Sequence, residues 1–114
     1  MPPRSAWRRS SVALAALACL LPNSASALDA AREAALGDLV RQDCGSCHGL
    51  SLKGGLGKPL RPDALAGVDV DGLASIILDG VPGTPMPPWR GLISPEEAKW
   101  IAAQLKKGAF HEAP

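Results

Sequence analysis

The chain has 114 residues, 46% of them hydrophobic, and its 12 basic and 11 acidic side chains leave a formal net charge of +1. This length allows one domain with a small core. The balanced charge gives no indication of nucleic-acid binding, which usually shows as a strong basic excess.

Residues 1–27 have the pattern of a cleaved secretory signal peptide. A positively charged start precedes an apolar run over residues 12–21, which is shorter than the roughly 20 residues needed to span a bilayer. Ala25-Ser26-Ala27 then fits the small-x-small cleavage pattern. We expect cleavage after Ala27, export to the bacterial periplasm, and a single domain over residues 28–114 without a membrane span.

Two other interpretations of this segment remain open. Arg8-Arg9 is compatible with a twin-arginine signal, and Cys19 with a lipoprotein cysteine. For Arg8-Arg9, the positively charged start of an ordinary signal peptide is favoured over a twin-arginine signal. Leu20 and Leu21 continue the apolar run beyond Cys19, so this cysteine is expected to be removed with the signal.

The domain over residues 28–114 is poor in the features that stabilise small exported proteins. It contains no tyrosine, and its large aromatic side chains are Trp89, Trp100 and Phe110. A disulfide between Cys44 and Cys47 would close only a short loop and constrain the unfolded chain little. We therefore expect another source of stability, such as a bound group.

A first helix is predicted over residues 28–43. Asp29 can cap its N-terminus, and Leu36 lies on its apolar face, with Gly37 beside it. Residues 50–67 are rich in glycine and proline and are predicted to form a loop.

A short middle helix is predicted over residues 70–79. Asp69 or Asp71 can cap it, and Gly80 ends it. Its buried face is expected to contain Leu73, Ile76 and Ile77.

Four prolines between residues 82 and 89 exclude a helix there and favour a stiff, extended segment. The last helix is expected to begin after Ser94, which forms a capping box with Glu97, and to end at Gly108. Its apolar face contains Trp100, Ile101 and Leu105. No segment shows the alternation of a strand, so the predicted fold is all-α, with helices joined by long loops that wrap something.

Cys44-x-x-Cys47-His48 is the motif that carries chemistry. A structural zinc site would need four ligands, and the remaining histidine, His111, lies far away in the terminal tail. A thioredoxin-like dithiol would need a preceding strand, whereas a helix is predicted here. The third possibility is covalent haem, in which the two thiols bind the two vinyl groups of one porphyrin and the histidine becomes an axial ligand. This possibility is favoured, because a large apolar haem would also supply the missing core.

Met86 is the expected sixth ligand of the iron. It is the one methionine that remains after signal removal, and Pro85 and Pro87 on both sides hold it in a rigid segment. Gap-filling in the core is the alternative role for a methionine. His111 is the alternative ligand, although a solvated position in the tail is favoured for it.

Two further residues are candidates for contacts around the haem. A ligating histidine usually donates its second N–H to a carbonyl, and Pro59, or a residue near it, can provide one. Simple stiffening of the loop is an equally good explanation of Pro59. Trp89 can pack on the haem, donate to a propionate, or only fill the core.

These motifs together resemble those of the class I cytochromes c. The resemblance rests on "CGSCHG", "GKPL", "GTPMPPW" and the predicted helices, and it extends over essentially all of residues 28–114. It implies N- and C-terminal helices that cross near Gly37 or Leu36, a short middle helix, and long loops around one covalent haem c. It also places the carbonyl that accepts the histidine N–H on Pro59.

A narrower resemblance is to the NirC type, the small periplasmic mono-haem cytochromes c of nitrite reductase gene clusters in denitrifying bacteria. It implies a monomeric electron carrier, not an enzyme, that receives electrons from a quinol-linked donor and passes them to cytochrome cd-type nitrite reductase. An accessory role in maturation of the d-type haem of that reductase is the alternative. A ligand sensor is disfavoured, because it would require Met86 to leave the iron.

Overall fold

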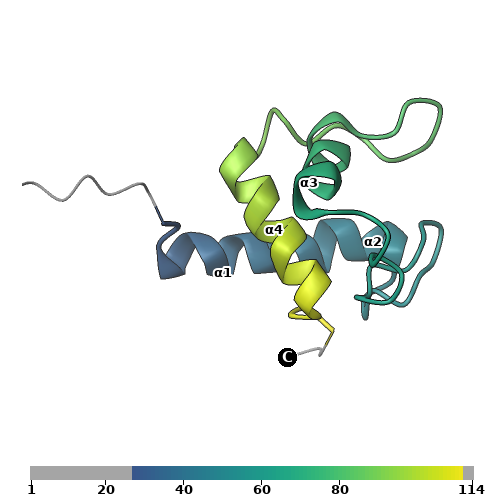
Figure 1. The fold of residues 1–114 in the computed structure, drawn as a ribbon, viewed down its shortest axis with the longest axis horizontal. Helices are drawn as coiled ribbons and strands as arrows, with labels where there is room; N and C mark the ends of the chain where they lie inside the picture. The colour runs from purple at the N-terminus through teal and green to yellow at the C-terminus, as the bar shows by residue number, and fades with distance from the viewer. Residues whose placement is uncertain (1–26, 112–114) are drawn as a thin grey trace, which may run out of the picture.

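The computed structural model describes residues 27–111, so the predicted signal peptide and Cys19 lie outside the described residues. The described part of the chain is helical and contains no strand, which confirms the all-α prediction (Figure 1). None of its helices is long and apolar enough to cross a membrane. The elements in chain order are α1 (Ala30–Leu39), the π-helical turn η1 (Val40–Cys44), α2 (Gly45–His48), α3 (Val70–Asp79) and α4 (Pro95–Lys107).

The N-terminal helical segment is longer than the sequence indicates. Asp29 caps α1 as predicted, because its side chain accepts a hydrogen bond of 2.7 Å from the backbone N–H of Arg32. The predicted helix ends at Asp43, but in the structure η1 and α2 continue it through His48. The wider π turn ends at Cys44 and α2 contains the rest of the Cys44-x-x-Cys47-His48 segment, so this motif is carried on a helix and not on a loop.

Helix α3 has the predicted bounds. Asp69 is its N-cap and accepts from the backbone N–H of Gly72 at 2.6 Å. Gly80 ends it with a φ of 67°, a conformation that other residues rarely adopt. Leu73 and Ile77 are buried as expected, but the prediction for Ile76 is wrong, since this side chain is 41% exposed. Ile76 lines a cavity to which the buried Leu73 and Ile77 also contribute.

Helix α4 begins with the predicted capping box. The Ser94 hydroxyl accepts from the backbone N–H of Glu97 at 3.1 Å, and the Glu97 carboxylate accepts from the backbone N–H of Ser94 at 2.8 Å. Ile101 and Leu105 are buried, whereas Trp100 is half-buried. The Trp100 and Phe110 rings lie 6.1 Å apart at an interplanar angle of 60°.

Helix α4 crosses α1 and also packs against α3 (Figure 1). Gly37 is buried, and a Cβ atom there would lie 3.3 Å from Nη1 of Arg41 and 3.6 Å from the Phe110 ring. Phe110 follows the end of α4, so a helix crossing at Gly37 or Leu36 stays a prediction. The buried core comprises Leu36, Val40, Leu52, Leu65, Leu73, Ala74, Ile77, Leu78, Ile93, Ala98, Ile101, Ala102, Leu105 and Phe110.

Candidate functional site

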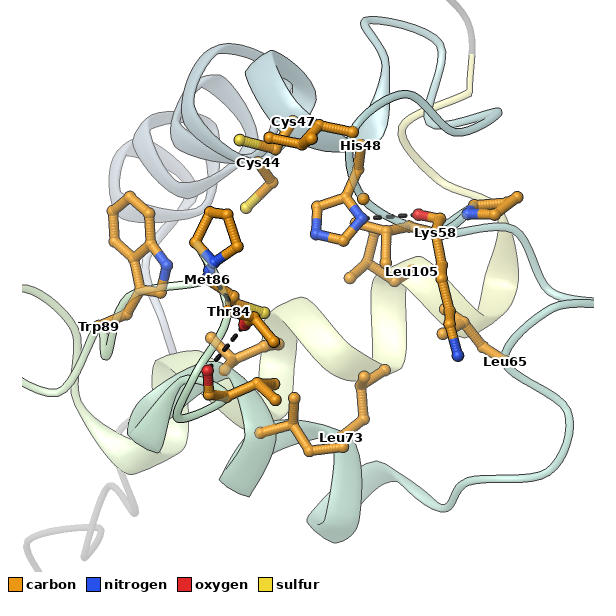
Figure 2. Close-up of a pocket in the computed structure, with 18 of the residues that line it drawn as sticks. Cys44, Cys47, His48, Lys58, Leu65, Leu73, Thr84, Met86, Trp89 and Leu105 are labelled. Carbon is orange, nitrogen blue, oxygen red and sulfur yellow. Dashed lines mark hydrogen bonds between the residues drawn. The ribbon is translucent and has the colours of Figure 1, made fainter.

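Four side chains singled out in the sequence meet at one cavity. Cys44, Cys47 and His48 reach it from the end of the N-terminal helical segment, and Met86 reaches it from the proline-rich segment after α3 (Figure 2). The cavity has a volume of about 750 Å³, and the loops before and after α3 form most of its wall, together with Leu73, Ile76 and Ile77 of α3 and Leu105 of α4. Segments that are about 40 residues apart in the sequence therefore present thiols, an imidazole and a thioether to the same space.

The His48 ring is held by a backbone carbonyl. Its Nδ1 atom lies 2.6 Å from the carbonyl oxygen of Lys58 (Figure 2). Because a carbonyl can only accept, Nδ1 carries a proton, and in the neutral imidazole the lone pair is then on Nε2. The expectation that Pro59 or a residue near it provides this carbonyl is confirmed, whereas the resemblance placed it on Pro59 itself, one residue too far along the chain. Pro59 is the next residue after Lys58, and the carbonyl of Lys58 points to the His48 ring.

Gly57 is a second contact of the His48 ring, and the sequence analysis missed it. A Cβ atom at this position would lie 2.7 Å from both Cε1 and Nδ1 of the imidazole. The backbone N–H of Gly57 also donates to the carbonyl of Cys47 at 2.8 Å. The loop can close over the ring only because residue 57 has no side chain. The sequence feature that could have indicated this contact is the glycine two residues before Pro59.

The segment that carries Met86 is organised by Thr84. The Thr84 hydroxyl donates to the carbonyl of Val81 at 2.7 Å and accepts from the backbone N–H of Met86 at 3.3 Å. The backbone N–H of Val81 donates in turn to the carbonyl of Met86 at 3.3 Å. These bonds close a turn that presents the half-buried Met86 side chain to the cavity. Prolines alone suggested the rigidity of this segment, and the role of Thr84 was not predicted.

The two cysteines of the motif are not joined by a disulfide, and both are half-buried. Burial raises the pKa of the Cys44 thiol to about 11, and the nearby Asp43 carboxylate adds to this shift. The Cys44 thiol is therefore neutral near pH 7, as expected for a group at an apolar wall.

The remaining candidates are divided between the cavity and the surface beyond it. Pro59 and Trp89 both line the cavity. His111 does not line it, and its Nε2 atom lies 3.4 Å from the carbonyl oxygen of Leu60. Within residues 27–111, no group of three or more His, Cys, Asp or Glu side chains is arranged so that it could hold a metal ion by itself.

The cavity fits a large apolar cofactor that has its own metal ion. Its volume falls within the range of about 300–1,000 Å³ that is usual for cofactor sites. Leu73, Ile77 and Leu105 line it and belong to the packed core, so a bound group would complete that core. Two thiols followed by a histidine are the residues that attach a haem, and a thioether suits its iron.

Comparisons with known proteins agree with this site. Residues 31–105 match the family described as cytochrome c oxidase, cbb3-type, subunit III. The chain is 56% identical over 96 residues to cytochrome c55X of Paracoccus denitrificans, covering 82% of this chain and 93% of that protein. It is 51% identical over 92 residues to cytochrome c55X of Pseudomonas aeruginosa, covering 80% and 77%. A 36% identity over 90 residues to the dihydro-heme d1 dehydrogenase of Pseudomonas aeruginosa covers 79% of this chain but 17% of that longer protein.

A solved structure supports the fold as well. The c-type cytochrome NirC superposes with a TM-score of 0.71 at 51% identity, covering 73% of this chain and 98% of that one. The expected class I cytochrome c fold and the expected resemblance to NirC are thereby confirmed. The chain therefore belongs to the c-type cytochromes, which carry a covalently bound haem c, within the group that contains the cytochromes c55X and NirC.

Proposed function

We propose that this protein is a periplasmic electron carrier whose single haem is attached through Cys44 and Cys47 and coordinated by His48 and Met86. The observation that supports this proposal is that all four side chains line one apolar cavity from two separate segments. The haem, when bound, supplies a reversible one-electron change between Fe(III) and Fe(II).

The chain's own residues set the conditions for this change. The Lys58 carbonyl holds the Nδ1 proton of His48, which leaves Nε2 as the donor atom. The Thr84 turn holds the thioether of Met86, a soft ligand that favours Fe(II) and raises the reduction potential. With two protein ligands, the iron has no open position for a substrate, so the site suits electron transfer and not catalysis.

The proposed acceptor is cytochrome cd-type nitrite reductase, with a quinol-linked donor upstream. The similarity to NirC and to the cytochromes c55X supports a place in the nitrite reductase system of denitrification. The proposed signal peptide over residues 1–27 would deliver the chain to the periplasm.

One observation favours a second candidate function, which is maturation of the d-type haem of the same reductase. The chain resembles a segment of a protein named dihydro-heme d1 dehydrogenase. A dehydrogenation releases electrons, and a small cytochrome is a suitable acceptor for them. This role would place the protein in the assembly of the reductase and not in its turnover.

A single strain can separate the two functions. Met86→Ala keeps the residues proposed to attach the haem but changes its potential, and His111→Ala is the matched control outside the cavity. A carrier predicts that the Met86→Ala strain makes reductase with its full d-type haem, and that the purified variant reduces this enzyme at an altered rate. A maturation factor predicts reductase that is short of d-type haem in the Met86→Ala strain. If neither quantity differs from the His111→Ala control, both proposals are wrong.

A further inference from the structure

One stretch of the cavity wall, residues 61–68, belongs to no helix. Its backbone forms local turns, in which the N–H of Leu65 donates to the carbonyl of Arg61 at 3.0 Å and the N–H of Val68 donates to that of Leu65 at 3.3 Å. Ala64, Leu65 and Val68 nevertheless line the cavity, and Figure 2 shows Leu65 there. Because local turns open at a low cost in free energy, this wall needs a contact from elsewhere in the chain to stay closed.

Lys106 of α4 provides such a contact. Its Nζ atom donates to the backbone carbonyl of Leu65 at 2.7 Å and also donates to the carbonyl of Val68. Because the donor is an ammonium group, each of these hydrogen bonds is stronger than one between neutral groups. The Lys106 side chain is half-buried, and Leu105, the residue before it, lines the same cavity. Lys106 is 41 and 38 positions away from its two acceptors, so it ties the loop to a helix that is distant in the sequence.

We propose that Lys106 is a positioning residue for the haem environment, which holds residues 61–68 against α4 and so keeps water away from the bound haem. This inference rests on the proposed electron-carrier function. Water that reaches the cavity would favour Fe(III), because the oxidised iron carries the larger charge, and solvent access is one of the features that set the potential of a metal site. Lys106 thus raises the reduction potential, as the Met86 thioether does, without being a ligand.

The test compares Lys106→Met with Lys107→Met in the haem-loaded protein. Both changes remove one positive charge from the last turn of α4, but in the described part of the chain only Lys106 donates to the loop, and Lys107 is exposed. Lys106→Met is expected to have a lower reduction potential than both the unmodified protein and Lys107→Met. Equal potentials in the two variants would show that charge alone acts and would overturn the proposal, as would an unchanged potential in Lys106→Met.

Amide hydrogen exchange of the same variants tests whether the loop opens. In Lys106→Met, exchange of the Leu65 and Val68 N–H groups is expected to accelerate about tenfold, the factor for one hydrogen bond to a charged group. The Gly57 N–H, which donates to the carbonyl of Cys47 at 2.8 Å, is the internal control and should exchange at an unchanged rate. Equal acceleration at all three N–H groups would indicate general destabilisation and overturn the inference, as would unchanged exchange at Leu65 and Val68.

The unmodified protein separates this inference from the proposed function. If its haem iron shows no reversible one-electron change between Fe(III) and Fe(II), the electron-carrier function is wrong and this inference fails with it. If that change is present, and Lys106→Met alters neither the potential nor the exchange rates, this inference alone is overturned.

Discussion

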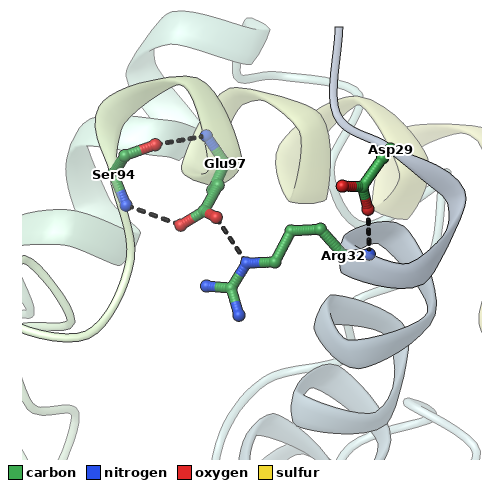
Figure 3. A network of polar contacts seen from close by, with 4 residues as sticks. All are labelled: Asp29, Arg32, Ser94 and Glu97. Atoms are coloured by element: carbon green, nitrogen blue, oxygen red, sulfur yellow. Dashed lines mark hydrogen bonds and ion pairs between the residues drawn. The ribbon is translucent and has the colours of Figure 1, made fainter. Parts of the chain in front are cut away.

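Arg32 and Glu97 join the first turns of α1 and α4. The Arg32 Nε–H donates to the Glu97 carboxylate at 2.5 Å, and the same carboxylate closes the capping box with Ser94 (Figure 3). One side chain thus caps α4 and links it to the helical segment that carries the haem-attachment motif. The two residues are 65 positions apart in the sequence, so this pair links the two ends of the described chain.

Stability should depend on the protonation of Glu97. The hydrogen bond from Arg32 lowers the pKa of this carboxyl below its ordinary value of 4.5, and the backbone N–H of Ser94 lowers it further. A lowered pKa in the folded state gives a stabilisation that is present above about pH 4.5 and is lost as the pH falls through the folded pKa. Glu97→Gln should therefore be less stable than the unmodified protein at pH 7, and the difference should shrink toward pH 3.

The measurement is the thermal unfolding midpoint of both proteins across this pH range. Glu96→Gln is the matched control, because Glu96 lies in the same helical turn and forms no ion pair among the described residues. If the unfolding midpoint of Glu97→Gln lies below that of the unmodified protein by the same amount at every pH, this account is contradicted. The surface position of Arg32 implies that added salt should also reduce the deficit.

Gly57→Ala should displace the His48 ring. The added methyl group would lie 2.7 Å from the imidazole, so the ring or the loop must move, at a cost of about 1–3 kcal/mol in stability. Gly67→Ala is the control, because a Cβ atom there meets nothing within 4 Å. Electron paramagnetic resonance of the oxidised protein should report a changed axial ligand field for Gly57→Ala alone. Identical spectra for both variants would show that the close contact does not fix the ring.

Thr84→Val should loosen the turn that presents Met86. The change removes one donated and one accepted hydrogen bond at nearly constant volume, which costs about 1–2 kcal/mol. The sulfur-to-iron charge-transfer absorption of the oxidised protein should then disappear at a lower temperature than in the unmodified protein. Thr84→Ser keeps the hydroxyl and should restore the higher temperature. If the absorption of Thr84→Val disappears at the same temperature as that of the unmodified protein, Thr84 does not hold Met86 in place.

The parts of the fold that the sequence predicted well are those set by local chemistry. The caps at Asp29, Asp69 and Ser94 act within three residues, so the starts of α1, α3 and α4 could be predicted closely. The continuation through η1 and α2 was not predicted, since the predicted helix ends at Asp43, directly before the motif.

The candidate site was predictable for the residues with distinctive chemistry and not for those with a purely geometric role. Cys44, Cys47, His48 and Met86 carry reactive atoms and could be identified from spacing and neighbours. The contact between Gly57 and His48 depends on how a loop folds back, which no local pattern encodes. The sequence could place the acceptor carbonyl near Pro59 but could not select Lys58 for the same reason, since carbonyl direction is a property of the folded loop.

The haem should be required for the fold. Leu73, Ile77 and Leu105 line the cavity, and without the haem this part of the core lacks a packing partner. Cys44→Ala/Cys47→Ala should therefore lose most of its helical signal in far-ultraviolet circular dichroism. Ser46→Ala, which changes the same motif but keeps both thiols, should remain helical. A stable helical double variant without haem would show that the polypeptide supplies a sufficient core.

The central claim is that His48 and Met86, which line one cavity from two separate segments of the chain, both coordinate the haem iron. The most direct test is the sulfur-to-iron charge-transfer absorption of the oxidised protein, measured for the unmodified chain, Met86→Ala and His111→Ala. The account predicts that Met86→Ala retains its haem, loses this absorption, has a lower reduction potential and binds cyanide, whereas His111→Ala keeps the absorption. Survival of the absorption in Met86→Ala, or its absence from the unmodified protein, would contradict the proposed ligation.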